Sequence, residues 1–371
     1  MLQDTPVTAA LARLLRLPFW LFARRPFTTP KKILILKPCC VSQVMLATPL
    51  LAVLSEAFPD ARIDWAVSEW ARPAIAANPR LTELLPAEIN AAEKTSWQDV
   101  NALIALIRHE GYDTCFIPSR SSLLAYIAWR AGIPQRIGLH VNGRGFAHTL
   151  AVRPAPDAVH EADVYLALAQ AIAVDPELLA KFGKMEFYPP DADRTAVTAR
   201  LVEDVDWLGE EPLVLMHPGG GHNPVQSVPE KQWPAERFAR LGNHLARTFN
   251  ARIILVGAAA DKPLTAAVAG MMSVPVINMA GTMGLGELGA LCEVADLYIG
   301  NDAGPTHIAA AIGCPTLAIF GPSQPTISGP YTPKGRKISL RREGENEVFS
   351  WADGVSTEEA IAAATQLLAP A

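Results

Sequence analysis

A tight polar loop between two short apolar runs holds the densest group of chemically useful side chains in this sequence. Its flanks, residues 297–299 and 316–320, have the composition of parallel strands buried on both faces. Between them stand Asp302, Gly304, Pro305, Thr306 and His307. Pro305 fits a first helical position and Gly313 a helix stop, so the spacing predicts a helix of about two turns.

The start of such a helix, at the carboxyl edge of a sheet, is a place where anions bind. Free backbone N–H groups and the helix dipole both point there. The alternative interpretation is an ordinary strand-to-helix turn, in which Asp302 caps the helix and His307 packs inside. The loop residues alone leave both interpretations open.

A second loop, Pro218-Gly219-Gly220-Gly221, directly follows the apolar run 212–217. Without Cβ atoms, glycines allow backbone N–H groups to approach a ligand closely, so this loop is a candidate phosphate cradle. It is not a Walker loop, because GK[ST] is absent, and no GxGxxG follows the first strand of either expected domain.

Two charged residues stand near these loops in the expected fold. Lys231 precedes the amphipathic helix predicted for residues 234–249, where it would either reach a phosphate or stand solvated. Asp261 ends the strand and loop of residues 251–261 and is placed to accept hydrogen bonds from ribose hydroxyls. Because all these loops follow strands, we expect them to face one cleft and to hold a nucleotide through its phosphates. No metal is needed, since Lys231, backbone N–H groups and a helix start can neutralise a diphosphate.

Composition bounds the class of protein. The chain has 371 residues, of which 50% are hydrophobic and 19% charged, so two well-packed domains are expected. The net charge of −5 argues against a general nucleic-acid binder. The five cysteines form no CxxC pair, so the sequence indicates neither a zinc site nor a disulfide framework, and a reducing cytoplasm is the simplest setting.

Apolar strand-like and helix-like segments alternate along the chain, which predicts an α/β fold of two doubly wound, Rossmann-like parallel sheets. We expect an amphipathic extension at 1–30, a first domain at 31–190, a helix and linker at 191–211, a second domain at 212–350 and a C-terminal helix at 351–371. Residues 44–57 and 160–182 are each predicted as one helix, with Thr48-Pro49 a cap or a kink in the former.

The N-terminal extension is apolar and aromatic over residues 9–26 but is interrupted by Arg13, Arg16 and Pro18. It is too short and too charged to span a bilayer and lacks a signal-peptide cleavage pattern. Two interpretations remain: peripheral contact with a membrane surface, or packing of a helix on the protein surface.

Several stretches resemble glycosyltransferase family 9, the ADP-heptose:lipopolysaccharide heptosyltransferases, over residues 31–370. They are ILILKPCCVSQVMLATPLL, HPGGG with KQWPAERFARL, and GNDAGPTHIAAAIGCPTLAIFGP; YDTCFIPSRSS and GIPQRIGL match more weakly. The resemblance implies the GT-B architecture, with residues 31–190 binding the acceptor and 212–350 the nucleotide-sugar donor across a central cleft. It also implies inverting transfer of a heptose from ADP-heptose to a lipopolysaccharide-type, lipid-linked acceptor at the cytoplasmic face of the inner membrane, without a cofactor.

Carried over residue by residue, the resemblance assigns Lys231 and Ser227 to the donor diphosphate, Asp261 to the ribose, Met283 to the adenine and Asp302 to the sugar. Lys231 and Asp302 are also expected to take part in catalysis. The role of the motif histidine, His307, stays open between structure and chemistry. The full set implied to bind the donor is Gly219, Gly220, Ser227, Lys231, Gly257, Asp261, Met283, Asp302, Ala303, Gly304, Thr306 and His307.

One departure from the family pattern concerns catalysis. After the first strand the family has Gly-Asp, whose aspartate is the proposed general base, and this chain has Ser42-Gln43. A carboxamide cannot take up a proton at physiological pH, so Gln43 cannot be that base. Another carboxylate such as Asp163 or Glu161 would replace it, or the acceptor needs less activation, or the chain binds a sugar nucleotide without turning it over. A sugar-nucleotide epimerase of similar architecture is a further, more remote reading.

Overall fold

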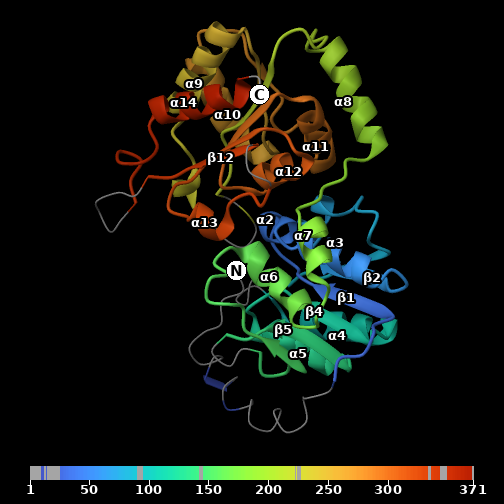
Figure 1. The fold of residues 1–371 in the computed structure, drawn as a ribbon. Helices are drawn as coiled ribbons and strands as arrows, with labels where there is room; N and C mark the ends of the chain where they lie inside the picture. The colour runs from blue at the N-terminus through green and yellow to red at the C-terminus, as the bar shows by residue number, and fades with distance from the viewer. Residues whose placement is uncertain are drawn as a thin grey trace. The chain divides into compact units, whose positions relative to one another are not determined.

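Parallel β-sheets form the framework of the protein. The computed structural model describes residues 10–11, 14, 26–89, 95–141, 145–221, 223, 227–332, 336–342 and 349–369. The described residues up to 184, apart from 73–77, form one compact unit, and residues 73–77 with those from 185 onward form the other. Each unit is built on one six-stranded sheet within these described ranges (Figure 1). The N-terminal segment 9–26, for which membrane contact and packing on the protein surface were both left open, lies almost wholly outside them.

The first unit contains the strands β1 Lys32–Leu36, β2 Arg62–Val67, β3 Glu83–Pro86, β4 Thr114–Ile117, β5 Gln135–Leu139 and β6 Leu150–Val152. They lie in the order β3-β2-β1-β4-β5-β6, and every neighbouring pair is parallel. Residues 33–36 of β1 are wholly buried, as a central strand covered by helices on both faces must be.

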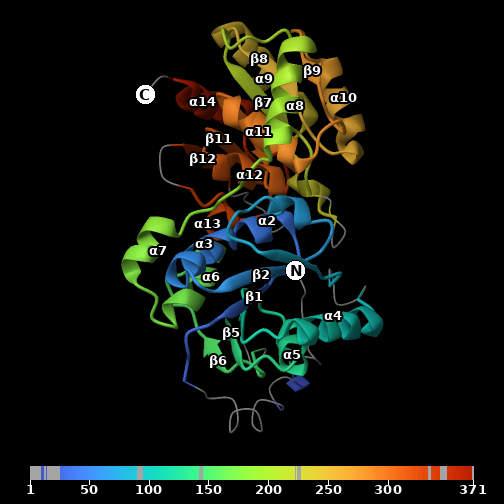
Figure 2. The ribbon, with the colours of Figure 1, turned by 90° about the vertical axis from the view of Figure 1, so that its right-hand side faces the viewer.

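The helices of the first unit are α2 Val41–Met45, α3 Thr48–Ala57, α4 Trp97–Glu110, α5 Ser122–Arg130, α6 Glu161–Gln170 and α7 Pro176–Phe182. The 3₁₀ turn η1, Arg72–Ala74, includes residues of both units. Helices α4 and α5 cover one face of the sheet and α3 and α6 cover the other, with α7 packed against α3 (Figure 2). Helix α4 begins at a reciprocal cap between Ser96 and Asp99 and ends at Gly111, whose φ is +69°.

The second unit repeats the pattern. Its strands are β7 Leu213–His217, β8 Arg252–Leu255, β9 Ile277–Asn278, β10 Leu297–Asn301, β11 Thr316–Ile319 and β12 Lys337–Leu340, ordered β12-β11-β10-β7-β8-β9 and all parallel. Its helices are α8 Asp191–Glu203, α9 Ala235–Phe249, α10 Lys262–Met271, α11 Leu285–Val294, α12 Gly304–Ile312, α13 Pro325–Ser328 and α14 Thr357–Leu368, with the 3₁₀ turns η2 Pro229–Lys231 and η3 Ala259–Asp261.

Successive side chains of the central strands alternate between two apolar cores. Val214 and Met216 point into the core beneath α9, α10 and α14, whereas Leu213 and Leu215 point into the core beneath α8, α11 and α12. The period of two is that of a strand buried on both faces. The predicted doubly wound α/β class is therefore confirmed, as are the short helix ending at Gly313 and the C-terminal helix.

Some element predictions were wrong in detail. The segment 44–57 is not one helix: α2 ends at Met45 and α3 begins at Thr48, whose hydroxyl donates to the Met45 carbonyl at 2.7 Å. The segment 160–182 is likewise divided into α6 and α7, with Ala173 between them at a φ of +58°. Helix α8, expected in a linker at 191–211, packs against α11 inside the second unit. Among the described helices, none combines the length and apolar character that crossing a membrane requires.

Candidate functional site

In the second unit, the functional loops gather where the strand order reverses. Strands β7 and β10 are neighbours, and the connections that leave them run to opposite sides of the sheet. The glycine loop 218–221 follows β7, and Asp302 follows β10. Such a switch point, at the carboxyl ends of parallel strands, is where open α/β sheets bind ligands.

Asn301, the last residue of β10, fastens the surrounding loops together. Its fully buried amide donates to the Pro218 carbonyl at 2.7 Å and to the Gly219 carbonyl at 2.9 Å. Its oxygen accepts the Trp233 N–H at 3.0 Å. One side chain thus satisfies three backbone groups from two separate segments. Asn301 was not predicted as a site residue, although a polar residue at the end of an apolar strand is a sign that its side chain binds neighbouring loops.

Lys231 and Asp302 meet beside this amide. Lys231 Nζ donates to Asp302 Oδ2 at 2.6 Å, and Ser323 Oγ donates to the same oxygen at 2.5 Å. The carboxylate is 5% exposed and the lysine side chain 22% exposed. An ammonium has three N–H donors, and among the described residues only Asp302 takes one of them. Neither the ion pair nor Ser323 was predicted.

Helix α12 begins directly after this carboxylate, at Gly304, with Ala303 as its cap. No side chain caps it, Pro305 has no N–H, and the Thr306 N–H donates to the Ala303 carbonyl at 3.2 Å, so the helix dipole rather than a row of open N–H groups favours an anion at this end. Thr306, expected beside the phosphates, and His307, whose role was left open, both lie inside the fold. Thr306 is buried and donates from Oγ1 to the Asn301 carbonyl at 2.6 Å, and His307 is 1% exposed. For His307 the geometry favours the structural interpretation.

The glycines of the loop after β7 have structural reasons of their own. A Cβ at Gly219 would collide with the Asp261 carboxylate, and Gly220 and Gly221 have φ values of +115° and +75°. Asp261 closes η3 after β8, and its Oδ2 accepts the Ala258 N–H at 2.8 Å. The glycine loop and the carboxylate expected at the ribose therefore lie in direct contact.

Buried His217 lies beside Asp261, and three donor candidates remain to be placed: Gly257, Ser227 and Met283. The imidazole Nε2 of His217 lies 3.8 Å from Asp261 Oδ2, and burial lowers its pKa despite that carboxylate. Gly257 lies against Asp261 as well, since a Cβ there would come within 2.9 Å of the Asp261 Cβ. Ser227 is exposed, and Met283 is partly buried against the core beneath α8 and α11. The described contacts do not bring these last two to the Lys231–Asp302 pair.

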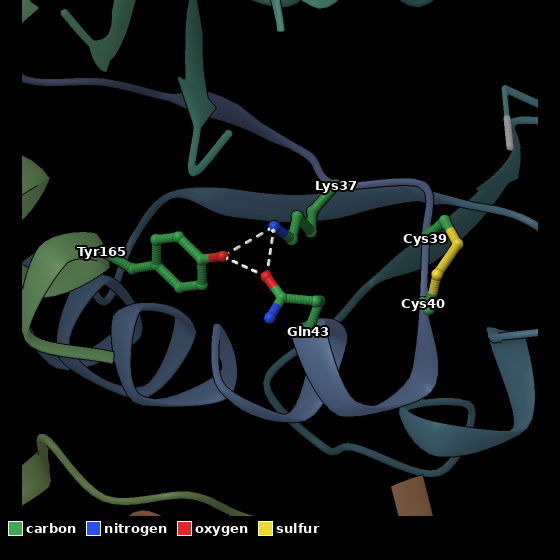
Figure 3. The surroundings of a disulfide bond; sticks show 5 residues. All are labelled: Lys37, Cys39, Cys40, Gln43 and Tyr165. Atoms are coloured by element: carbon green, nitrogen blue, oxygen red, sulfur yellow. Dashed lines mark hydrogen bonds between the residues drawn. A yellow bond between two sulfur atoms is a disulfide. The ribbon is translucent and has the colours of Figure 1, made fainter. Parts of the chain in front are cut away.

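The first unit has its own polar cluster, at the end of β1. Lys37 Nζ donates to the Pro118 carbonyl at 2.9 Å, to the Tyr165 hydroxyl at 2.8 Å and to Gln43 Oε1 at 3.3 Å. The Tyr165 hydroxyl donates to the same amide oxygen at 2.5 Å. Figure 3 shows the triangle formed by the lysine, the tyrosine and the glutamine. Gln43 itself stands on α2, and only it was singled out from the sequence.

Electrostatics make Lys37 unusual. The residue is 6% exposed, and burial lowers the pKa of its amine to about 7. Glu161, a candidate replacement base, is bound by Arg120 through bonds of 2.6 and 2.9 Å from Nη1 to its two oxygens. Asp163 stands on the same helix and is half-buried.

The cysteines require one correction. The sequence analysis took them to indicate no disulfide, yet the adjacent residues Cys39 and Cys40 are joined by one, on the loop between β1 and α2 (Figure 3). Spacing rules look for separated cysteines and so missed a bond between neighbours. The other three, Cys115, Cys292 and Cys314, are buried thiols.

The weaker motif GIPQRIGL has a structural explanation. The Arg136 guanidinium is buried and donates to the Ala147 carbonyl at 2.7 Å and to the Ile133 carbonyl at 2.5 Å. A Cβ at Gly138 would collide with the ring of His148, which is buried against it. This motif therefore holds β5 to the segment after it and contributes no side chain to the cluster around Gln43.

One group of acidic residues in the described part of the chain has metal-ligand spacing: Asp64, Glu83 and Glu110. Arg62 reaches Asp64 at 2.9 Å and Glu83 at 2.5 Å, and Lys32 reaches Glu110 at 2.8 Å. Each carboxylate thus already has a cationic partner, which is the ordinary structural use of such a group.

Comparison with solved structures identifies the class. A family 9 glycosyltransferase from Veillonella parvula superposes with a TM-score of 0.77 at 25% identity, covering 91% of this chain and 97% of that one. The ADP-heptose lipopolysaccharide heptosyltransferase II of Escherichia coli gives a TM-score of 0.71 at 23% identity, covering 91% and 98%. Two Rossmann-like units of this kind are those of the GT-B architecture, the class of fold to which this protein belongs.

The sequence comparison identifies the family. The model of glycosyltransferase family 9 (heptosyltransferase) matches residues 100–352, and the chain belongs to this family. Lipopolysaccharide heptosyltransferase 2 of Salmonella typhimurium is 26% identical over 314 residues, covering 83% of this chain and 88% of its own length. Lipooligosaccharide heptosyltransferase 2 of Haemophilus influenzae is 26% identical over 322 residues, covering 84% and 89%. The family match contains the loops of the second unit and begins after Gln43.

Proposed function

We propose that this glycosyltransferase moves a heptose, or a closely related sugar, from ADP-heptose to a hydroxyl of a lipopolysaccharide-type, lipid-linked saccharide. The observation that carries the proposal is the Lys231–Asp302 pair, held by Asn301 at the switch point of the second sheet beside the glycine loop. A cation, open backbone N–H groups and a ribose-facing carboxylate are what an ADP-sugar requires. The named relatives supply the choice of a heptose.

The reaction inverts the anomeric carbon. The acceptor oxygen forms a bond to that carbon while the bond from the carbon to the diphosphate oxygen breaks, and the electron pair leaves with the diphosphate. Lys231 and the dipole at the start of α12 stabilise the negative charge that grows on this leaving group, so no metal is needed. Asp302 holds the ammonium in place and contacts the sugar. Ser227, Asp261 and Met283 are proposed for the diphosphate, the ribose and the adenine.

The test is calorimetric binding of ADP-heptose to the purified protein, followed by transfer to a lipid-linked acceptor that lacks the terminal heptose. The anomeric configuration of the product, read by NMR, tests inversion. Absence of donor binding would remove the proposal. Because a lipid-linked acceptor resides in a membrane, we also propose that the protein works at the cytoplasmic face of the inner membrane, which flotation with vesicles tests.

A second candidate is a sugar-nucleotide-binding protein that has lost transfer. It is favoured by Gln43, whose oxygen is bound by Lys37 and Tyr165 and which cannot accept a proton. The two candidates differ in a single assay. Donor binding without turnover, together with turnover gained by Gln43→Asp, would support the second and exclude the first.

A further inference from the structure

The amide that stands where the family has its base lies in contact with a buried amine. Lys37 is the first residue after β1, and its Nζ is 3.3 Å from Gln43 Oε1. A lysine close to this position was not among the residues expected to act. The question is whether this amine can take the proton that the amide cannot.

The immediate partners of the Lys37 amine are neutral. The Pro118 carbonyl and the Gln43 amide oxygen can only accept hydrogen bonds, so they engage two N–H groups in either protonation state. The Tyr165 hydroxyl can accept a third N–H from the ammonium or donate to the lone pair of the free amine. The surroundings therefore satisfy the amine before and after it gains a proton.

Charged groups nearby do not fix Lys37 in its protonated form. Glu161 on α6 favours the ammonium and Arg120 after β4 opposes it, and these two are bonded to each other. Tyr165 on α6 stays a neutral phenol, because burial raises its pKa. Burial is the largest influence on Lys37, and with a pKa of about 7 a large fraction of it is a free amine at neutral pH.

Gln43 is what leaves the amine available. A carboxylate at the same place would lie within ion-pairing distance of Nζ and would hold the lysine protonated. The amide supplies an acceptor oxygen without a charge. With Gln43 in place of a carboxylate, all three hydrogen-bond partners of the buried amine are neutral.

We propose that Lys37 is the general base of this enzyme, an inference that rests on the proposed transfer reaction. The acceptor hydroxyl takes the place of Gln43 Oε1 beside the amine. As its oxygen bonds to the anomeric carbon and the diphosphate departs with the electron pair, its proton passes to Lys37 Nζ. The resulting ammonium donates to the Pro118 carbonyl and to the Tyr165 hydroxyl, and it later releases the proton to water.

The kinetic test uses Lys37→Met, which removes the base, and Lys37→Arg, which keeps a cation that cannot deprotonate. Both are expected to lower kcat by about 10²–10⁴-fold, the range that general-base assistance supplies. Their affinity for ADP-heptose, measured by calorimetry, should stay at the parent value. Lys32→Met, at the start of β1 where the lysine is ion-paired at 2.8 Å to Glu110, is the matched control and should keep its kcat.

The pH profile separates a base from a structural lysine. The acid limb of kcat/KM in the parent should fall near pH 7, following the free amine. Gln43→Asp adds a carboxylate base and should move this limb to lower pH, and Gln43→Asp combined with Lys37→Met should retain transfer. If Asp163→Asn, and not Lys37→Met, removes the limb, the assignment to Lys37 is overturned.

A direct titration decides the point without turnover. In the full-length protein with isotope-labelled lysines, the Lys37 signal, identified by its loss in Lys37→Arg, should titrate near pH 7. A midpoint near the ordinary lysine value overturns the inference. A parent that neither binds ADP-heptose nor transfers removes the proposed function and this inference with it. If the parent transfers and Lys37→Met is equally fast with the same pH profile, the proposed function stands and only the assignment of Lys37 as the base is overturned.

Discussion

Lys231 and Asp302 lie 71 residues apart in the sequence, and 2.6 Å separates the lysine nitrogen from the nearer carboxylate oxygen. The carboxylate is almost fully buried, so it fixes the direction of the ammonium more firmly than a surface ion pair would. A diphosphate that binds beside this pair meets a cation already held in place. Little side-chain entropy is then lost on binding, which favours affinity.

Lys231→Met should weaken ADP binding about 10- to 100-fold, because a hydrogen bond to a charged group contributes about 1.5–3 kcal/mol. Calorimetry with ADP measures this directly. Arg240→Met is the control, since it breaks an exposed ion pair of 3.1 Å with Glu358 in the same unit. Equal affinities for the parent and Lys231→Met would show that the lysine does not touch the diphosphate.

Asn301→Ala should lower the free energy of unfolding by about 2–4 kcal/mol, because three buried backbone groups lose their partner. Urea unfolding followed by fluorescence gives the value. The control Asn243→Ala removes one exposed hydrogen bond, which the Asn243 amide oxygen accepts from the Ser273 N–H at 2.9 Å. The change in the free energy of unfolding should then stay below about 1 kcal/mol. A similar small change in both would contradict the fastening role of Asn301.

Gly219→Ala should displace the Asp261 carboxylate, since the new methyl group would occupy its place. We expect weaker binding of adenosine diphosphate together with a lower melting temperature. Gly270→Ala on α10 is a matched substitution with open space around it, and it should stabilise the protein by about 0.5–1 kcal/mol. Unchanged ADP affinity in Gly219→Ala would show that Asp261 does not bind the ribose.

The free energy of unfolding should depend on pH because of Lys37. Its pKa is about 7 in the folded protein and 10.5 ordinarily, so between these values the unfolded chain binds a proton that the folded protein does not. Stability contributed by this group therefore rises with pH through that window, and below pH 7 the folded protein bears the full cost of a buried ammonium. The stability of Lys37→Met relative to the parent should be highest below pH 7 and fall as pH rises to 10.5.

Chemical unfolding at a series of pH values tests this expectation. Asn243→Ala serves again as the control, because the lost amide does not titrate and its effect should not vary with pH. A difference between Lys37→Met and the parent that is flat over the whole range would mean that Lys37 keeps an ordinary pKa in the folded protein.

Much of the fold could be predicted because its determinants are local. The apolar runs of the central strands, the glycine that ends α12 at a φ of +91° and the capped start of α14 are all legible in short windows. The edge strands β3, β6 and β9 have four, three and two residues, too few to display a period. The division between α6 and α7 was missed because Ala173, at a φ of +58°, gives no warning of a turn.

The site, too, has a part that could be predicted from the sequence and a part that could not. That the glycine loop and Asp302 lie together follows from topology, since both succeed neighbouring strands of a parallel sheet. That Lys231 bonds to Asp302, or that Lys37 meets both Tyr165 and Gln43, depends on long-range packing. Tyr165 is 128 residues from Lys37 in the sequence, and no local pattern relates them.

The amide of Asn301 has a wider consequence for how this glycosyltransferase could diversify. Because it clamps the backbone of the glycine loop and the approach to α9 at once, neither segment can shift without straining the other. In the proposed function, the loops that hold the nucleotide therefore form one connected block. Substitutions of side chains on that block, such as Ser323, which bonds to Asp302, are then the expected route to a different sugar preference.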